Sequence, residues 1–294
     1  MNMKRTIFLF IISFVALLSS CSDEKLSDSI FDDSERGRTE FDLWLLSNYT
    51  YPYNIDFKYR MEDIESDITY TLAPAELGKS IKLAKLVKHL WLEAYDEVAG
   101  IDFTRTYIPK VIHLIGSPAY DIRNAIILGT AEGGLKVTLY MVNYLDEIMK
   151  DKDGLNYYYF HVMHHEFAHI LHQTKKYDPD FKKISDTDYI GGDWVNVSDS
   201  EAYQAGFVSP YSMSAPDEDF VEIISIFITS IPQVWNDMLT EAGKNGAPGA
   251  NILNRKFEMV ANYLKDLWKI DIYDLRDIVQ RRTAEINQLD LDKL

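Results

Sequence analysis

Residues 161–172 read HVMHHEFAHILH, and within them His165, Glu166 and His169 form the pattern H-E-x-x-H. Residues four apart share one face of a helix, so the two imidazoles can bind one metal ion. Glu166 follows the first histidine and can reach a water molecule at that metal. Two imidazoles that hold zinc, with a neighbouring glutamate as proton acceptor, are suited to metal-assisted hydrolysis. The stretch therefore predicts a helix that carries a catalytic zinc ion.

The histidines are concentrated in this stretch. Seven occur in the chain, and five of them lie between residues 161 and 172. The neighbouring residues are mostly apolar and include no Gly or Pro from 157 to 172, so we expect a buried helix. The alternative is that these are ordinary packed or exposed histidines. Burying several imidazoles without polar partners is costly, which favours a metal site.

A catalytic zinc ion usually takes three protein ligands and leaves one position for water. In the metzincin pattern H-E-x-x-H-x-x-G-x-x-H, the third histidine would fall at Lys175 and the glycine at His172. This excludes the metzincin class. No histidine follows His172, so a ligand from the later part of the chain must be a carboxylate.

Glu218 is the best candidate for that carboxylate. Glu218 and Glu222 are four residues apart at the start of an apolar segment and would share a helix face. Two buried carboxylates repel each other unless a cation or hydrogen-bond donors neutralise them. Zinc at Glu218 and the free N–H of a ligand histidine at Glu222 would do so. The alternatives are Glu222 as the ligand, Asp193 or Glu201 as weaker candidates, and Glu218 as a first-turn charge that suits the helix dipole.

Tyr211 lies seven residues before Glu218 and can donate a hydrogen bond to the oxyanion that forms during amide hydrolysis. Tyr203 is an alternative donor. Most of the 19 tyrosines must serve packing, so residue type does not choose between them.

Two further histidines belong to the same helix. His164 points about 100° away from His165, which indicates a supporting or structural role. His172 lies one turn beyond His169, and we interpret it as a helix cap or a residue that faces the cleft.

The remaining pattern predicts an α+β fold. Helical spacing extends from 74 to 98, and alternation or short apolar runs predict strands at 54–61, 111–115, 125–128 and 135–141. Residues 129–134 read GTAEGG and predict a loop. Further helices are expected at 217–231, 252–268 and 273–289.

Helix, strands and then the motif helix are the order found in zincin peptidases, in which a twisted sheet covers the helix with the zinc ligands. We therefore predict a zincin-like fold with a small mixed sheet and a helical C-terminal part. One edge of such a sheet usually binds the substrate peptide as an added strand, and residues 135–141 are the candidate edge.

Residues 1–20 predict a lipoprotein signal peptide. Lys4 and Arg5 precede an apolar core that is too short to span a bilayer. The core ends in LSSC at residues 18–21, which resembles a bacterial lipobox, where cleavage precedes a cysteine that is then lipidated. Cys21 is the only cysteine, and we expect it to carry a lipid anchor.

The polar residues 21–38 predict a flexible tether. Residues 39–294 predict the metallopeptidase domain, with an N-terminal α/β lobe to about residue 175 and a helical lobe after it. Cleavage before Cys21 leaves 28 of the 30 basic side chains against all 46 acidic ones, a net charge of −18. Such a surface repels phosphate and argues against a nucleic-acid partner.

Nearly the whole chain after Cys21 resembles the substrate import-associated zinc metallohydrolase lipoproteins. The matching segments are PYNIDFKYR, LWLEAYDEVAG, PKVIHLIGSPAY, LGTAEGGLKVTLYMVN, HHEFAHILHQ, GFVSPYSMSAPDEDFVEIIS and LRDIVQRR. The resemblance implies a bacterial outer-membrane lipoprotein encoded beside nutrient-import machinery. Expected partners are a TonB-dependent receptor and a substrate-binding lipoprotein. The residues SDE after Cys21 resemble the surface-export signals of some Gram-negative lipoproteins.

The pattern of site residues is also similar to the lethal factor type of gluzincin. There the second glutamate motif reads E-x-x-x-E, and a tyrosine lies seven residues ahead of it. That similarity implies Glu218 as zinc ligand, Glu222 as partner of a ligand histidine, and Tyr211 as hydrogen-bond donor to the transition state.

Together these features predict a zinc-dependent peptidase, tethered through Cys21, that acts on a peptide or protein. Zinc would be held by His165, His169 and Glu218, and Glu166 would activate the water. One alternative is a non-catalytic zincin-fold lipoprotein that captures a peptide or glycan for an import complex. Another is hydrolysis of a different amide or ester.

Overall fold

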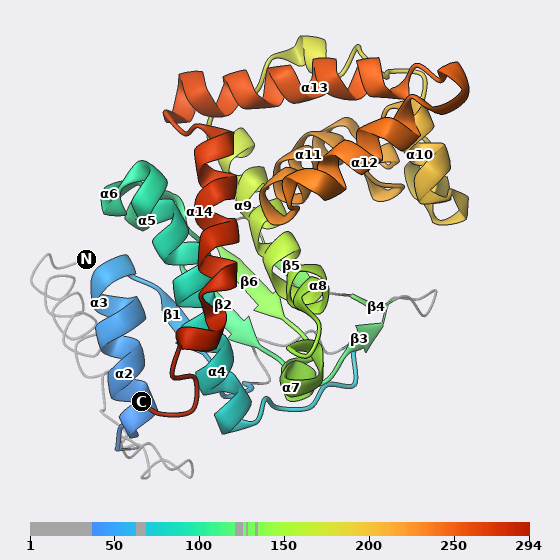
Figure 1. Cartoon of the computed structure of the whole chain (residues 1–294). Helices are drawn as coiled ribbons and strands as arrows, with labels where there is room; N and C mark the ends of the chain where they lie inside the picture. The colour runs from blue at the N-terminus through green and yellow to red at the C-terminus, as the bar shows by residue number, and fades with distance from the viewer. Residues whose placement is uncertain (1–36, 63–68, 121–125, 128, 133–134) are drawn as a thin grey trace, which may run out of the picture. The chain divides into compact units, whose positions relative to one another are not determined.

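The computed structural model describes residues 37–62, 69–120, 126–127, 129–132 and 135–294 (Figure 1). Its N-terminal part contains a mixed four-stranded sheet. The strand order is β1-β2-β6-β5, and only β5 runs antiparallel to its neighbour. The strands are β1 (Asp56–Lys58), β2 (Val111–Leu114), β5 (Gly129–Glu132) and β6 (Lys136–Leu139). A separate antiparallel pair joins β3 (Ala119–Tyr120) to β4 (Ile126–Ile127).

The sheet corrects two predictions. The expected edge at 135–141 is wrong, because β6 lies inside the sheet between β2 and β5. The expected loop at 129–134 is wrong over its first four residues, which form β5, the edge strand. Ala131 pairs with Val137 in that ladder, and Val137 is fully buried. Pairing with an apolar neighbour thus overrides the weak strand preference of GTAE.

Most of the remaining regular structure in the described chain is helical. The helices before residue 175 are α2 (Glu40–Leu45), α3 (Tyr51–Tyr53), α4 (Leu77–Val87), α5 (Glu93–Ala99), α6 (Ile101–Tyr107), α7 (Leu145–Ile148), α8 (Lys152–Leu155) and α9 (His161–Thr174). The later ones are α10 (Asp199–Ala205), α11 (Pro216–Thr229), α12 (Pro232–Ala242), α13 (Gly249–Tyr263) and α14 (Ile272–Ala284). Within the described residues no strand occurs after Leu139. The predicted α+β class with a small mixed sheet is confirmed.

The motif helix α9 is central to the packing of residues 39–294, which form one compact unit. Its Phe167 is fully buried and meets Tyr95 edge to face, with ring centroids 4.7 Å apart. On the sheet side α9 contacts the edge strand at Gly129, beside Val162. A helix buried on several sides holds its polar side chains in fixed positions.

Helix α11 lies against α9 and also contacts α14 (Figure 1). Pro216 occupies its first turn, where a missing N–H costs nothing. Ten of its 14 residues are buried, so neighbouring elements enclose the helix on most sides, and its buried residues include the polar Asp219 and Glu222. The helix predicted at 217–231 is thus present as α11, and Pro232, just after the predicted end, begins α12, a helix that was not predicted.

Residues 1–36, which include the predicted signal peptide, Cys21 and most of the predicted tether, lie outside the described residues. Ala125 and Leu128 of a predicted strand also lie outside them. Among the helices that are described, none combines the length and the apolar character needed to cross a membrane.

Candidate metal centre

Two helices bring the candidate ligands together. His165 and His169 lie one turn apart on α9, and Glu218 lies in the first turn of α11. The first turn of α11 also carries Asp217 and Asp219, and acidic side chains are favourable at that end of a helix. The packing of α11 on α9 therefore places a carboxylate opposite the two imidazoles.

Three ligand atoms converge between these helices. Nε2 of His165 lies 3.1 Å from Oε2 of Glu218 and 3.1 Å from Nε2 of His169. The third side, from His169 Nε2 to Glu218 Oε2, measures 3.3 Å. Tetrahedral ligands at about 2.0–2.1 Å from zinc are separated by about 3.3 Å. The triangle therefore fits one face of a tetrahedral zinc site, with the fourth corner left for water or substrate.

Glu222 lies one turn further along α11 and is buried. Its Oε1 lies 2.8 Å from Nδ1 of His165 and 2.9 Å from Nε2 of His161, and Ser209 donates to its other oxygen at 2.7 Å. Burial raises the pKa of Glu222, but the contacts with His161 and His165 outweigh burial and hold the pKa well below its usual value. Glu222 is thus an ionised acceptor for several donors.

His161, His165 and Glu222 form a second group close enough to hold a metal. It shares His165 with the first group, and its separations are ordinary hydrogen-bond lengths. A ligand histidine commonly donates its other N–H to a carboxylate. Glu222 in that role leaves Nε2 of His165 for the metal, so the group with His169 and Glu218 is the better metal candidate.

Without metal, the centre favours a protonated His165. Burial lowers the pKa of His165, but the hydrogen bonds to Glu218 and Glu222 outweigh it and raise the pKa to about 10. Burial likewise raises the pKa of Glu218, and the two imidazoles outweigh it and lower the pKa below its usual value. Glu218 and Glu222 thus stabilise a positively charged imidazolium at His165, and a bound metal cation could take the place of its proton.

Glu166 lies next to this triangle and is partly exposed. Burial raises its pKa, with a further rise from Glu218, against the opposing effect of His165 and His169. Within the described residues, its carboxylate forms no hydrogen bond or ion pair. A carboxylate with a raised pKa and no fixed partner is suited to accept and return a proton.

Tyr211 lies beside His165, with ring centroids 5.9 Å apart. Its ring meets Trp194 edge to face at 5.2 Å, and 37% of the residue is exposed. Burial and the neighbouring Glu218 carboxylate raise its pKa, so the hydroxyl keeps its proton at neutral pH. The alternative, Tyr203, lies on α10 and packs against the main core. No contact within the described residues joins Tyr203 to the centre.

The other candidate residues have different roles. Glu201 completes the capping box of α10 with Ser198, and Asp193 is exposed in a short helical turn. His164 is fully buried, and its Nδ1 lies 2.9 Å from the hydroxyl of Tyr95, as a structural histidine would. His172 contacts the ring of His169.

Sequence reasoning missed the contacts of His161, Ser209 and His172 with the centre. The i, i+4 spacing of His161 to His165 and the i, i+3 spacing of His169 to His172 were the available signals. Ser209 had no such signal, because its contact depends on how the segment before α11 folds back.

A buried ion pair supports the start of α11 and was also not predicted. Nζ of Lys256, on α13, lies 2.7 Å from Oδ2 of Asp219, and both side chains are fully buried. Lys256 also donates to the carbonyl of Gly206 at 2.8 Å, and the hydroxyl of Tyr189 donates to Asp219 at 2.8 Å. Burial raises the pKa of Asp219 and lowers that of Lys256. The positive charge of Lys256 partly offsets the rise for Asp219, and the negative charge of Asp219 partly offsets the fall for Lys256.

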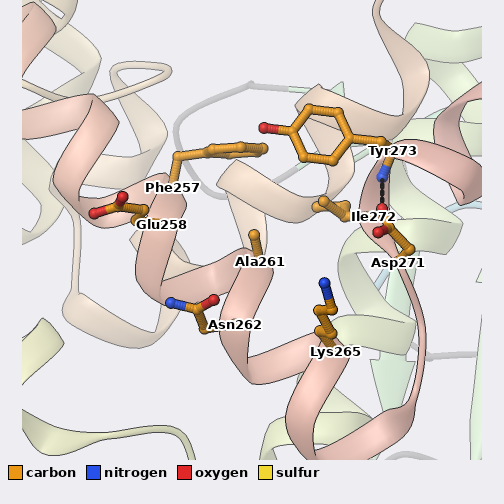
Figure 2. A pocket seen from close by; sticks show the side chains of 8 residues that line it. All are labelled: Phe257, Glu258, Ala261, Asn262, Lys265, Asp271, Ile272 and Tyr273. Carbon is orange, nitrogen blue, oxygen red and sulfur yellow. Dashed lines mark hydrogen bonds between the residues drawn. The ribbon is translucent and has the colours of Figure 1, made fainter.

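Away from the centre, the described residues include a surface pocket of about 220 Å³ between α13 and the start of α14 (Figure 2). Phe257 and Tyr273 form its apolar side. Asp271 lines it as well, but its carboxylate accepts the backbone N–H of Tyr273 and so caps α14. The pocket contains no member of the His–Glu groups described above.

Comparison with known proteins places this geometry in context. A family described as "Putative zinc-binding metallo-peptidase" matches residues 34–273. The chain is also similar to a crystal structure described as a putative zinc-binding metallo-peptidase from Bacteroides caccae, with 51% sequence identity and a TM-score of 0.76. That similarity covers 90% of this chain and 99% of the other. No curated protein matches the chain.

Proposed function

Because this chain belongs to the family of zinc-binding metallo-peptidases, we propose that it hydrolyses peptide bonds with a zinc ion held by His165, His169 and Glu218. The observation that carries the proposal is the triangle of Nε2, Nε2 and Oε2 atoms with sides of 3.1, 3.1 and 3.3 Å. Its dimensions suit tetrahedral zinc, and its third member is a carboxylate from a second helix, as in the gluzincin class of zincins.

When bound, zinc supplies Lewis acidity, which polarises the scissile carbonyl and makes a water molecule easier to deprotonate. Glu166 takes the proton of the attacking water and later gives it to the leaving amine. Its lack of a fixed partner in the described structure supports this role. The rise in its pKa does so too, because a more basic carboxylate accepts the proton of water more readily.

Tyr211 donates a hydrogen bond to the oxygen that becomes negatively charged as the water attacks. Its hydroxyl keeps the required proton, because burial and Glu218 raise its pKa. The rings of Trp194 and His165 both lie against the ring of Tyr211, which supports a fixed position for its hydroxyl. Donors fixed in advance stabilise the transition state more than donors that must reorganise.

A peptide substrate is supported by the sheet edge. Strand β5 pairs with β6 on one side, and no described strand covers its other side. Its backbone can therefore bind an extended peptide as an added strand. The contact of β5 with α9 places that edge beside the helix that carries His165 and Glu166.

The decisive experiment measures zinc content and cleavage of a peptide library by purified residues 39–294. We expect about one zinc per chain and cleavage by the wild type. Glu166→Gln should retain zinc but lose at least about a thousandfold in rate. Glu147→Gln, an exposed glutamate on α7, is the matched control and should behave as wild type.

Each outcome bears on a different part of the proposal. Wild-type rates in Glu166→Gln would overturn its role as the base. Zinc content unchanged by Glu218→Ala would overturn its role as a ligand. Zinc with peptide or glycan capture, but without cleavage of any peptide, would favour the binding lipoprotein instead.

The proposal extends to location. The lipobox-like LSSC at 18–21 and the resemblance to import-associated lipoproteins support an outer-membrane lipoprotein at the cell surface, beside a TonB-dependent receptor and a substrate-binding lipoprotein. Metabolic labelling with a fatty-acid analogue should label the wild type but not Cys21→Ser. Protease treatment of intact cells should remove the domain if it faces outward. Label retained in Cys21→Ser would exclude the anchor.

A further inference from the structure

The two imidazoles of the proposed centre differ in what lies at their second nitrogen. Nδ1 of His165 faces the carboxylate of Glu222 at 2.8 Å. Nδ1 of His169 instead faces another imidazole, with Nε2 of His172 at 3.0 Å. Metal-binding histidines usually donate to a carboxylate, a backbone carbonyl or water. An imidazole in that position therefore requires its own explanation.

The direction of the second bond follows from the chemistry of the ring. If His169 uses the lone pair of Nε2 for the metal, its Nδ1 carries the proton and donates. Nε2 of His172 must then accept, so His172 is neutral and carries its own proton on Nδ1. One ring thus determines the tautomer of the other.

His172 is held in place for this role. It is buried, and its ring centroid lies 5.6 Å from that of Tyr177 and 6.4 Å from that of Phe220. Those two rings stack on each other at 4.0 Å with an angle of 9° between their planes. The hydroxyl of Tyr177 bonds to Asp217, next to Glu218. The rings of His172, Tyr177 and Phe220 thus pack together and link the end of α9 to the start of α11.

We propose that His172 is a positioning residue that fixes the ring orientation and tautomer of His169 by accepting its Nδ1–H. This inference rests on the proposed zinc centre and adds a residue to it. A neutral acceptor also has a chemical consequence. Among the described residues, Glu218 and Glu222 are then the only carboxylates bonded to His165 and His169. Less negative charge therefore surrounds the metal than if each histidine had a carboxylate at its second nitrogen.

Two variants separate the hydrogen bond from packing. His172→Phe keeps an aromatic ring against Tyr177 and Phe220 but removes the acceptor. His172→Gln loses the ring but offers a carbonyl oxygen at about the place of Nε2. Gln173→Ala, the exposed neighbour on the same helix, is the matched control.

Zinc affinity is measured by competition with a chromophoric chelator, and ligand geometry by the visible spectrum of the cobalt-substituted protein. We expect His172→Phe to bind zinc about 10- to 100-fold more weakly and to shift the cobalt bands. His172→Gln should recover most of the loss, and Gln173→Ala should match wild type. Wild-type affinity in His172→Phe, or no recovery in His172→Gln, would overturn the proposal.

A measurement on the wild type covers the case in which the Phe variant does not fold. Nitrogen NMR of the zinc-loaded protein with labelled histidines reports which ring nitrogen carries the proton. We expect His172 to be neutral and protonated on Nδ1, and a proton on its Nε2 would refute the inference. A wild type that binds no zinc would instead refute the proposed function. Tight zinc binding by both wild type and His172→Phe would refute only the role of His172.

Discussion

Oε1 of Glu222 lies 2.8 Å from Nδ1 of His165, the ring nitrogen that does not face Glu218. His161 and Ser209 bind the same carboxylate. The side chain of Glu222 is nearly inaccessible to water, so the charge depends on these donors. Glu222 therefore holds the ring of His165 through the nitrogen that faces away from Glu218.

Replacing Glu222 should weaken metal binding. We expect Glu222→Gln to lower zinc affinity about 10- to 100-fold, because the amide gives His165 a weaker acceptor and places an NH₂ group among donors. Chelator competition measures the change. Glu147→Gln is the exposed control on α7, and equal affinity in the two variants would contradict the role of Glu222.

The Tyr211 hydroxyl should affect turnover rather than binding. Tyr211→Phe removes a proposed donor to the oxyanion, and we expect kcat to fall about 10²- to 10³-fold with little change in KM or zinc content. Steady-state kinetics on a cleaved library peptide measure both constants. Tyr203→Phe removes the hydroxyl of the alternative donor and should keep the wild-type kcat. If kcat fell in Tyr203→Phe but not in Tyr211→Phe, Tyr203 rather than Tyr211 would be the donor to the oxyanion.

Zinc binding should release protons. The pKa of His165 is raised to about 10 in the metal-free protein, so the ring is an imidazolium at neutral pH and must lose its proton to bind zinc. Apparent zinc affinity should therefore rise by about tenfold per pH unit for each proton displaced, up to a pH of about 10. Titrations at pH 6, 7, 8 and 9 measure the slope, and a flat profile would contradict the assignment.

The same shift affects stability, with the opposite sign. A histidine whose pKa is higher in the folded state stabilises that state fully below the unfolded pKa of about 6.5. That contribution is lost as the pH rises from there through about 10. For the metal-free protein, we therefore expect the free energy of unfolding in urea to decrease over this range. A metal-free protein that becomes more stable from pH 7 to 9 would contradict the prediction.

The buried pair of Lys256 and Asp219 should matter for stability. Lys256→Met leaves Asp219 as an uncompensated buried charge, and we expect the free energy of unfolding to fall by about 3–5 kcal/mol. Adding Asp219→Asn should recover part of that loss, because the isolated charge is removed. Lys244→Met breaks an exposed pair with Glu241 and should cost no more than about 1 kcal/mol. Similar losses in both lysine variants would contradict the argument.

The sequence predicts those parts of the centre that depend on helical spacing. His165 and His169 meet because residues four apart share a helix face, and the same spacing placed Glu218 and Glu222 on one face of α11. The contact of Ser209 and the pairing of Lys256 with Asp219 join segments that are far apart in sequence or depend on a turn. No local pattern encodes such contacts.

The strands and the later helices show a similar limit. β5 contains a glycine and lacks a run of apolar residues, and it is a strand because β6 pairs with it. Helix α12 was not predicted, although Pro232 is suited to the first turn of a helix. In both cases the local residues allow two structures, and neighbours in space select one of them.

The absence of a side chain at Gly129 determines how near the sheet edge comes to α9. A Cβ there would lie 2.6 Å from Cγ1 of Val162 and 3.2 Å from the carbonyl oxygen of Thr138. A single methyl group would therefore push the strand and the helix apart. The same displacement would move an extended peptide bound along that strand away from His165. Gly129 would thus set the distance between a bound peptide and the proposed zinc ligands.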